Sequence, residues 1–178
     1  AAARRAFADE GAAIIGVGTA SSLYDIEGFY DSLSLTRVVQ TCLDQGYPPV
    51  ILLLELVTFV SARVLQWLGA PSSDAVQPLS SIVGGSKSGV FIARNFLYRA
   101  LSAVHAKWMP RGIASLSWID DINQRAEGLR SRVVAGLLGA GHHFAQEVAS
   151  LGLRLSQKSV VVANDPSLAR DIAAVRVC

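Results

Sequence analysis

Three aspartates in this sequence lie where predicted strands end or turn. Asp25 closes a predicted strand over residues 21–26, and Asp120 and Asp121 are adjacent at the predicted turn of a hairpin over residues 113–123. If these strands are neighbours in one sheet, their carboxylates converge on one edge, and converging carboxylates need a cation. In Mg²⁺ sites a few carboxylates and substrate phosphates complete the octahedron, and two ions about 4 Å apart clamp both oxygens of a phosphoryl displacement. The pattern therefore points to nucleotidyl transfer, although adjacent acids alone are more typical of a solvated turn.

The elements that must position these acids alternate between helical and extended patterns. Apolar residues at helical spacing predict helices over residues 4–15, 34–45, 50–68, 88–107 and 124–150. Shorter β-compatible runs bounded by turn residues predict strands over residues 21–26, 76–83 and 158–162, together with the 113–123 hairpin. This order predicts an α+β fold, in which a small, partly antiparallel sheet carries helices packed on one face.

The composition indicates a folded chain and leaves its partners open. Of the 178 residues, 51% are hydrophobic and 17% are charged, which allows enough burial for folding, and one domain is expected. A net charge of +2 identifies neither a nucleic-acid nor a membrane partner. Cys42 and Cys178 are too few for a disulfide framework or a four-cysteine zinc site, so we expect a reducing compartment. Residues 50–62 form the longest apolar run, but its length and Glu55 predict a buried helix and no stable membrane insertion.

Four segments, in order, resemble the palm motifs of reverse transcriptases, particularly those of group II introns and non-LTR retrotransposons. Residues 25–31, Asp-Ile-Glu-Gly-Phe-Tyr-Asp, resemble the first motif, and residues 85–89, Gly-Ser-Lys-Ser-Gly, resemble the second. Residues 118–121, Trp-Ile-Asp-Asp, are similar to the Tyr-x-Asp-Asp box, and residues 151–158, Leu-Gly-Leu-Arg-Leu-Ser-Gln-Lys, resemble the fourth motif. The resemblance covers residues 21–164, and its first, third and fourth motifs are the specific ones.

The resemblance implies a polymerase palm with a ferredoxin-like core and the activity of an RNA-directed DNA polymerase. Asp25 and Asp120 would hold two Mg²⁺ or Mn²⁺ ions with support from Asp121, and Lys158 would lie near the leaving pyrophosphate. Tyr30 would be the gate that excludes a ribose 2′-hydroxyl. The remaining residues that the resemblance implies in nucleotide binding are Phe29, Gly85, Ser88 and Gly89. The implied partners are an RNA template, a DNA primer and deoxynucleoside triphosphates.

The sequence also departs from the family pattern. Lys87-Ser88 stands where the family has Pro-Gln, Ala93-Arg94 stands where it has Ser-Pro, and Trp118 replaces the tyrosine of the third motif. We expect residues 1–20 to be a helix leading from a fingers region, residues 21–164 the palm, and residues 165–178 a tail that stops before a thumb. Because fingers and thumb would be missing, we expect this piece not to extend a primer by itself. It would act inside the cell, in the nucleus if it comes from a eukaryotic retroelement.

Two other classes of function compete with this interpretation. The order of strand, Gly84-Gly85-Ser86-Lys87-Ser88 and helix is typical of a phosphate-binding P-loop, but serine occupies both positions, 81 and 86, that Walker A requires to be glycine. A non-catalytic helical interaction fragment or membrane-associated fragment is the third interpretation, based on the apolar helix over residues 50–68. The spaced cations of the 88–107 helix and its end favour a nucleic-acid groove and a solvated face about equally. These cations are Arg94, Arg99, Lys107 and Arg111.

Overall fold

The computed structural model describes residues 9–64, 66–71, 74–76, 82 and 87–175. The chain divides into two compact units, the first formed by Ala1–Glu27 with Arg99–Cys178 and the second by Gly28–Tyr98. Helix α5 (Lys87–Trp108) contributes to both units. Its bounds confirm the helix predicted over residues 88–107.

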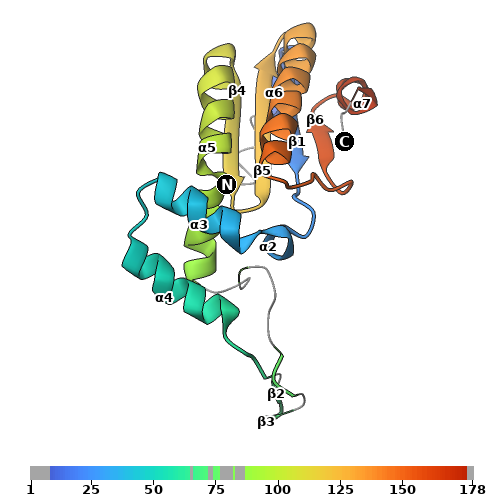
Figure 1. Ribbon diagram of the computed structural model, residues 1–178. Coiled ribbons are helices and arrows are strands. Elements are labelled where there is room, and N and C mark those ends of the chain that lie inside the picture. Colours follow the sequence, from blue (N-terminus) through green and yellow to red (C-terminus); the bar gives the residue numbers. More distant parts are fainter. Residues whose placement is uncertain (1–8, 65, 72–73, 77–81, 83–86, 176–178) are drawn as a thin grey trace. The chain divides into compact units, whose positions relative to one another are not determined.

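The first unit contains a four-stranded sheet (Figure 1). Its strands are β1 (Gly18–Tyr24), β4 (Ile113–Trp118), β5 (Asp121–Gly128) and β6 (Val160–Ala163), in the spatial order β4-β5-β1-β6. Every neighbouring pair is antiparallel, where the sequence predicts a sheet only partly so. Numbered along the chain, the order is 2-3-1-4, with β5 inserted between β1 and β4, which is a split β-α-β arrangement. The predicted α+β class is therefore confirmed.

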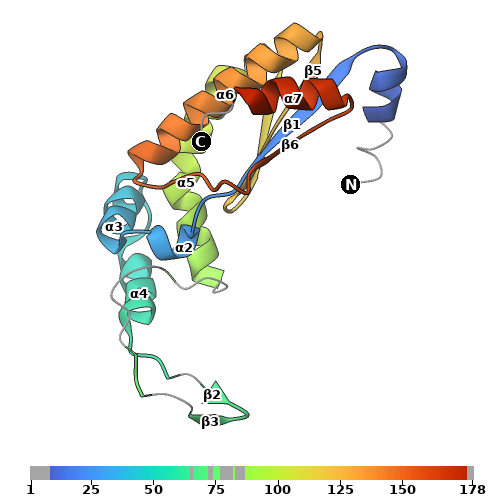
Figure 2. The ribbon, with the colours of Figure 1, turned by 90° about the vertical axis from the view of Figure 1, so that its right-hand side faces the viewer.

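Helices α6 (Arg130–Ser150) and α7 (Pro166–Ala174) pack on one face of this sheet (Figure 2). Alternate residues of β1 and β5 face the helices, so their side chains are buried every second position, as expected for a sheet covered on one side. Trp108, at the end of α5, packs against the same core. The buried residues of this core are Ala20, Ile113, Ala126, Val133, Leu137, Ala140, Leu168 and Ile172.

The second unit is mainly helical. Its elements are α2 (Phe29–Ser32), α3 (Leu35–Asp44), α4 (Pro49–Val60), the short strands β2 (Gln66–Trp67) and β3 (Ala70–Pro71), and the start of α5. Tyr47, in the α3–α4 connection, donates a hydrogen bond to the Glu55 carboxylate of α4 at 3.1–3.2 Å. Burial, followed by the Glu55 carboxylate, raises the pKa of the Tyr47 hydroxyl to about 12. This bond holds the connection against α4.

The prediction of a buried helix over residues 50–68 is wrong in two respects. Helix α4 ends at Val60, and the described residues that follow it, 61–64 and 66–68, are not helical. Only Leu52 and Phe59 are buried in α4. Six apolar side chains of α4 are between 43% and 72% exposed, namely Val50, Ile51, Leu53, Leu54, Val57 and Val60. An apolar sequence identified the helix, but apolar residues occur on all its sides, so the pattern could not say which side is covered.

Several predicted boundaries also shift. The hairpin turn consists of Ile119 and Asp120, because Trp118 already pairs with Asp121 across the two strands. Strand β5 continues to Gly128, so the following helix begins at Arg130 and not at residue 124. Helix α7 was not predicted; Asp165 caps it by accepting a hydrogen bond from the Ser167 backbone N–H at 2.8 Å. The strand predicted over residues 76–83 lies largely outside the described residues, which show only a bridge between Arg63 and Val76.

None of the described helices combines the length and the apolar character needed to cross a membrane. Helix α4 has 12 residues and so spans about 18 Å, which is shorter than the hydrocarbon core of a bilayer. The longer helix α5 carries charged side chains along its length, and α6 carries them near its two ends.

The contact between Trp108, at the end of α5, and helix α6 allows a prediction about stability. Gly139 of α6 faces the Trp108 ring, which would overlap with any added Cβ atom. The indole is also held in place, because its Nε1–H donates to Nδ1 of His143 at 3.3 Å. We expect Gly139→Ala to lower the free energy of unfolding by about 1–3 kcal/mol in urea denaturation, since overpacking outweighs the roughly 1 kcal/mol of helix propensity that alanine adds.

Gly11→Ala is the matched control for this substitution. Gly11 is also helical, and a Cβ added there would meet nothing within 4 Å. The control should leave the free energy of unfolding unchanged or raise it slightly. A Gly139→Ala protein as stable as the control would contradict the packing of Trp108 on α6.

Candidate functional site

The end of the sheet in the first unit collects the three candidate carboxylates. Strand β1 pairs with β5 up to the pair Tyr24–Ile122. Asp25, which follows Tyr24, and Asp121, which precedes Ile122, occupy the next position of the same antiparallel register. Asp120 lies in the two-residue turn just before β5. Asp25 and Asp120 are half-buried, and Asp121 is exposed. The antiparallel register therefore brings the end of β1 to the tip of the β4–β5 hairpin.

The surroundings of Asp120 disfavour its charged form. Burial, opposed in part by a hydrogen bond from its own backbone, raises the pKa of the Asp120 carboxyl above its usual value of 3.8. The negative charges of Asp121 and then of Asp25 raise it further. The ionised form of Asp120 is thus disfavoured at this edge unless a positive charge compensates it.

The backbone conformation at the hairpin tip is unusual. Ile119, directly before Asp120, has φ 60°, in the left-handed region that β-branched residues rarely adopt. Such strain costs about 1–3 kcal/mol and persists only where the surrounding structure enforces it. Here the enforcing structure is the pairing of Trp118 with Asp121, which leaves only two residues to reverse the chain.

The segment between α6 and β6 fixes the backbone of Asp25. Helix α6 ends at Ser150, Gly152 follows it with a φ of 77° that suits a glycine after a helix, and the chain then runs beside the end of β1. The Ser156 N–H donates to the carbonyl of Asp25 at 2.8 Å, and the Asp25 N–H donates to Oγ of Ser159 at 3.3 Å. Two residues after Asp25, the Glu27 N–H donates to the Arg154 carbonyl at 2.9 Å. Both backbone hydrogen-bonding groups of Asp25 are therefore bound by this segment, the carbonyl by Ser156 and the N–H by Ser159.

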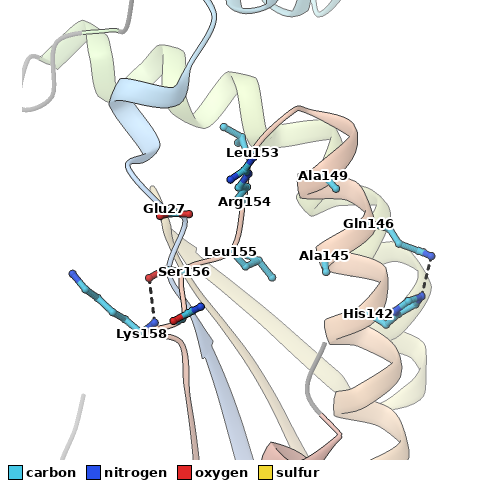
Figure 3. Close-up of a pocket in the computed structure, with 11 residues that line it drawn as sticks. Glu27, His142, Ala145, Gln146, Ala149, Leu153, Arg154, Leu155, Ser156 and Lys158 are labelled. Carbon is cyan, nitrogen blue, oxygen red and sulfur yellow. Dashed lines mark hydrogen bonds between the residues drawn. The ribbon is translucent and has the colours of Figure 1, made fainter. Parts of the chain in front are cut away.

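Lys158 belongs to this same segment. It lies between Ser156 and Ser159, and its backbone N–H donates to Oγ of Ser156 at 3.1 Å (Figure 3). Its side chain is exposed, and the described residues include no carboxylate within 4.0 Å of its ammonium group. The first unit thus brings Asp25, Asp120, Asp121 and the Lys158 backbone to one end of its sheet.

The three carboxylates are candidate metal ligands. Among the described residues, no group of three or more histidine, cysteine, aspartate or glutamate side chains is arranged to hold an ion. Carboxylate oxygens are the donors that Mg²⁺ and Mn²⁺ prefer, and Asp120 is an acid whose charge needs compensation. Mg²⁺ commonly uses only one or two protein carboxylates and completes its shell with water and substrate phosphate. The donor set therefore fits an ion held in part by substrate.

The residues implied in nucleotide handling lie in the second unit or outside the described residues. Phe29 is buried, and its ring centroid lies 5.3 Å from that of the half-buried Tyr30. The carbonyl of Tyr30 accepts a hydrogen bond from the Ile82 N–H at 3.4 Å. Ser88 and Gly89 lie in the first turn of α5, and Gly85 is outside the described residues. The P-loop interpretation depends on residues 84–86, which are also outside them.

Two serines contribute to the site that the sequence analysis did not single out. Ser156 and Ser159 both bind the backbone of Asp25, and the Ser159 hydroxyl also donates to the Ser156 carbonyl at 2.6 Å. Both side chains are buried although they are polar. The sequence could have indicated these serines by their position beside Lys158, between a predicted helix and a β-branched strand. Serine hydroxyls commonly form hydrogen bonds with nearby backbone in such turns.

Comparison with known proteins adds no family assignment. No protein-family model and no curated protein matches this chain.

The raised pKa of Asp120 predicts a pH-dependent stability. Because its pKa is higher in the folded protein than its usual 3.8, protonated Asp120 stabilises the fold below that pH, and this contribution is lost as the pH rises through the raised pKa. In metal-free buffer at pH 7, we therefore expect Asp120→Asn to raise the thermal unfolding midpoint. The difference from wild type should shrink when the pH falls toward 4.

Glu127→Gln is a suitable control, because Glu127 is an exposed acid near the other end of β5. It should leave the midpoint close to that of wild type at both pH values. An Asp120→Asn midpoint equal to or below that of wild type at pH 7 would refute the charge repulsion at the hairpin tip.

Proposed function

We propose that this chain is the palm region of an RNA-directed DNA polymerase of the retroelement type, which transfers nucleotides to a primer 3′ end. The observation that carries the proposal is the antiparallel register that brings Asp25, at the end of β1, to the hairpin turn that holds Asp120. The acids that the first and third motifs resemble are more than 90 residues apart in sequence, so their proximity depends on the fold. A sheet that had separated them would have removed the basis for the proposal.

The proposed mechanism gives each residue of this end of the sheet a separate role. Asp25 and Asp120 would hold the divalent ions, which would supply charge stabilisation to the phosphoryl transfer. Asp121, exposed beside them, adds negative charge that favours cation binding. Ser156 and Ser159 keep the Asp25 backbone in place, so that little reorganisation is needed when substrate binds.

Lys158 is proposed to act on the leaving group. It follows Ser156 by two residues and precedes Ser159, so its backbone is tied to the position of Asp25. An ammonium group there would offset negative charge on a departing pyrophosphate or donate a proton to it. Tyr30 of the second unit is proposed as the ring that excludes a ribose 2′-hydroxyl. The proposed substrates are deoxynucleoside triphosphates and a DNA primer paired to an RNA template.

A non-catalytic interaction fragment is the second candidate function. The observation in its favour is the exposed apolar surface of α4, since a helix with six exposed apolar side chains is typical of a segment that contacts a partner. This function requires no metal binding at the sheet edge, so a measurement of metal binding distinguishes the two candidate functions.

Titration of Mn²⁺, followed by water proton relaxation, is the test of the proposed function. We expect Asp25→Asn and Asp120→Asn each to weaken Mn²⁺ binding about tenfold or more, because each removes one charged oxygen ligand. Adding a deoxynucleoside triphosphate with a DNA primer on an RNA template should tighten Mn²⁺ binding by the wild type more than by either variant.

Glu127→Gln again serves as the control, since it removes an exposed acid of β5 far from the hairpin turn. It should bind Mn²⁺ as the wild type does. If Asp120→Asn binds Mn²⁺ with unchanged affinity, the metal role and the polymerase proposal are both rejected, and the interaction fragment is favoured.

A further inference from the structure

The first unit contains a pocket of about 750 Å³ whose α6 wall has no role in the proposed transfer reaction. It lies between α6 and the segment that follows it, and it is lined among others by Ala145, Ala149, Leu155, Arg154 and Lys158 (Figure 3). We refer to it as the α6 pocket. Its volume is within the range of about 300–1,000 Å³ that is common for small-molecule sites.

The two sides of the α6 pocket differ in chemistry. On the α6 side, Ala145 and Ala149 leave room because their side chains are small, and Leu155 extends toward them from the opposite segment (Figure 3). On the other side of that segment, Glu27 and Lys158 line the pocket (Figure 3). His142 and Gln146 of α6, whose side-chain nitrogens are 2.9 Å apart, also line the pocket, so its α6 wall combines an apolar part with one polar pair and faces a charged end.

The charges at this end are not neutralised within the described chain. Neither Arg154 nor Lys158 has a described carboxylate within 4.0 Å, and Glu27 has no described cation within that distance. The Glu27 and Arg154 backbones are joined by a hydrogen bond of 2.9 Å, so the two side chains originate from neighbouring points. Two cations against one acid favour a ligand that is an anion overall.

We propose that the α6 pocket binds a small organic anion with a flat apolar body, which packs on Ala145, Ala149 and Leu155 while its acidic group pairs with Arg154. Arg154 provides a planar donor group suited to a carboxylate, sulfonate or phosphate. This proposal is independent of the polymerase assignment, because it uses the apolar wall of α6 and no carboxylate of the sheet edge.

Ligand binding in the α6 pocket would affect the Asp25 backbone through residues 154–156 and the hydrogen bond from Ser156 to Asp25. The wall that carries Arg154 and Leu155 is the same segment whose residue Ser156 binds the Asp25 carbonyl at 2.8 Å. A ligand bridging this segment to α6 would reduce its local opening. Amide hydrogen exchange at Ser156 and Glu27, whose N–H groups both donate across this contact, should therefore slow on ligand binding.

The experiment uses naphthalene-2-sulfonate as the anionic compound and the neutral 2-naphthalenemethanol as its analogue, with binding measured by calorimetry and ligand-detected NMR. We expect one sulfonate per chain, bound about tenfold more tightly than the alcohol. Arg154→Gln should weaken sulfonate binding about tenfold and leave alcohol binding unchanged. Ala149→Phe, at an exposed position of α6, should abolish binding of both compounds by filling the apolar part.

Ala135→Phe is the matched control, because Ala135 is an exposed alanine of the same helix that does not line the pocket. It should bind sulfonate as the wild type does, and Asp120→Asn should as well, which separates this test from that of the metal site. Equal affinity for sulfonate and alcohol, or unchanged binding in both Arg154→Gln and Ala149→Phe, would overturn the proposal. Displacement of the sulfonate by a deoxynucleoside triphosphate would assign the pocket to the proposed polymerase site and would overturn it as a separate site.

Discussion

The pairing of β1 on both of its edges is the constraint on which the rest of the first unit depends. β1 is hydrogen-bonded to β5 over seven residue pairs, from Gly18–Gly128 to Tyr24–Ile122, and to β6 over four. A shift of this register by one residue would turn the side chains of β1 to the opposite face and separate Asp25 from the hairpin tip. The register therefore sets both the burial of the core and the location of the acids.

Packing of α6 on the sheet requires small residues at particular points. Gly136, Gly139 and Gly141 each face a larger side chain, from Ile113, Trp108 and Tyr24 respectively. The lack of a Cβ at these positions allows close approach of the helix, although glycine lowers helix propensity by about 1 kcal/mol at each. Tertiary contacts of the buried face must outweigh this loss. Glycine within α6 thus serves the packing of its neighbours and does not mark a break in the helix.

A polar group is also buried at this interface. Gln124 of β5 is fully buried, and its side-chain N–H donates to the Ala140 carbonyl of α6 at 3.4 Å. Ser22 of β1 lies opposite Gln124 in the register and is buried as well. Such a hydrogen bond contributes about 0.5–1.5 kcal/mol to net stability, and it is opposed by the burial of the Gln124 Oε1, which has no hydrogen-bond partner among the described residues. The hydrogen bond from Gln124 to the Ala140 carbonyl therefore favours one alignment of α6 over the sheet.

The sequence alone determined the class of fold, the main helices of the core and the hairpin that carries Asp120. Local patterns suffice for these features, because helical spacing, β-branched runs and turn residues act over a few residues. The tertiary structure alone decided that β1 is central, that Asp25 and Asp120 share one end of the sheet, and that Ser156 and Ser159 hold the Asp25 backbone. It also decided that α4 presents apolar side chains outward, whereas the sequence predicted their burial. The physical reason is that strand order and helix burial arise from contacts between segments distant in sequence, and no local pattern specifies which segment a face will meet.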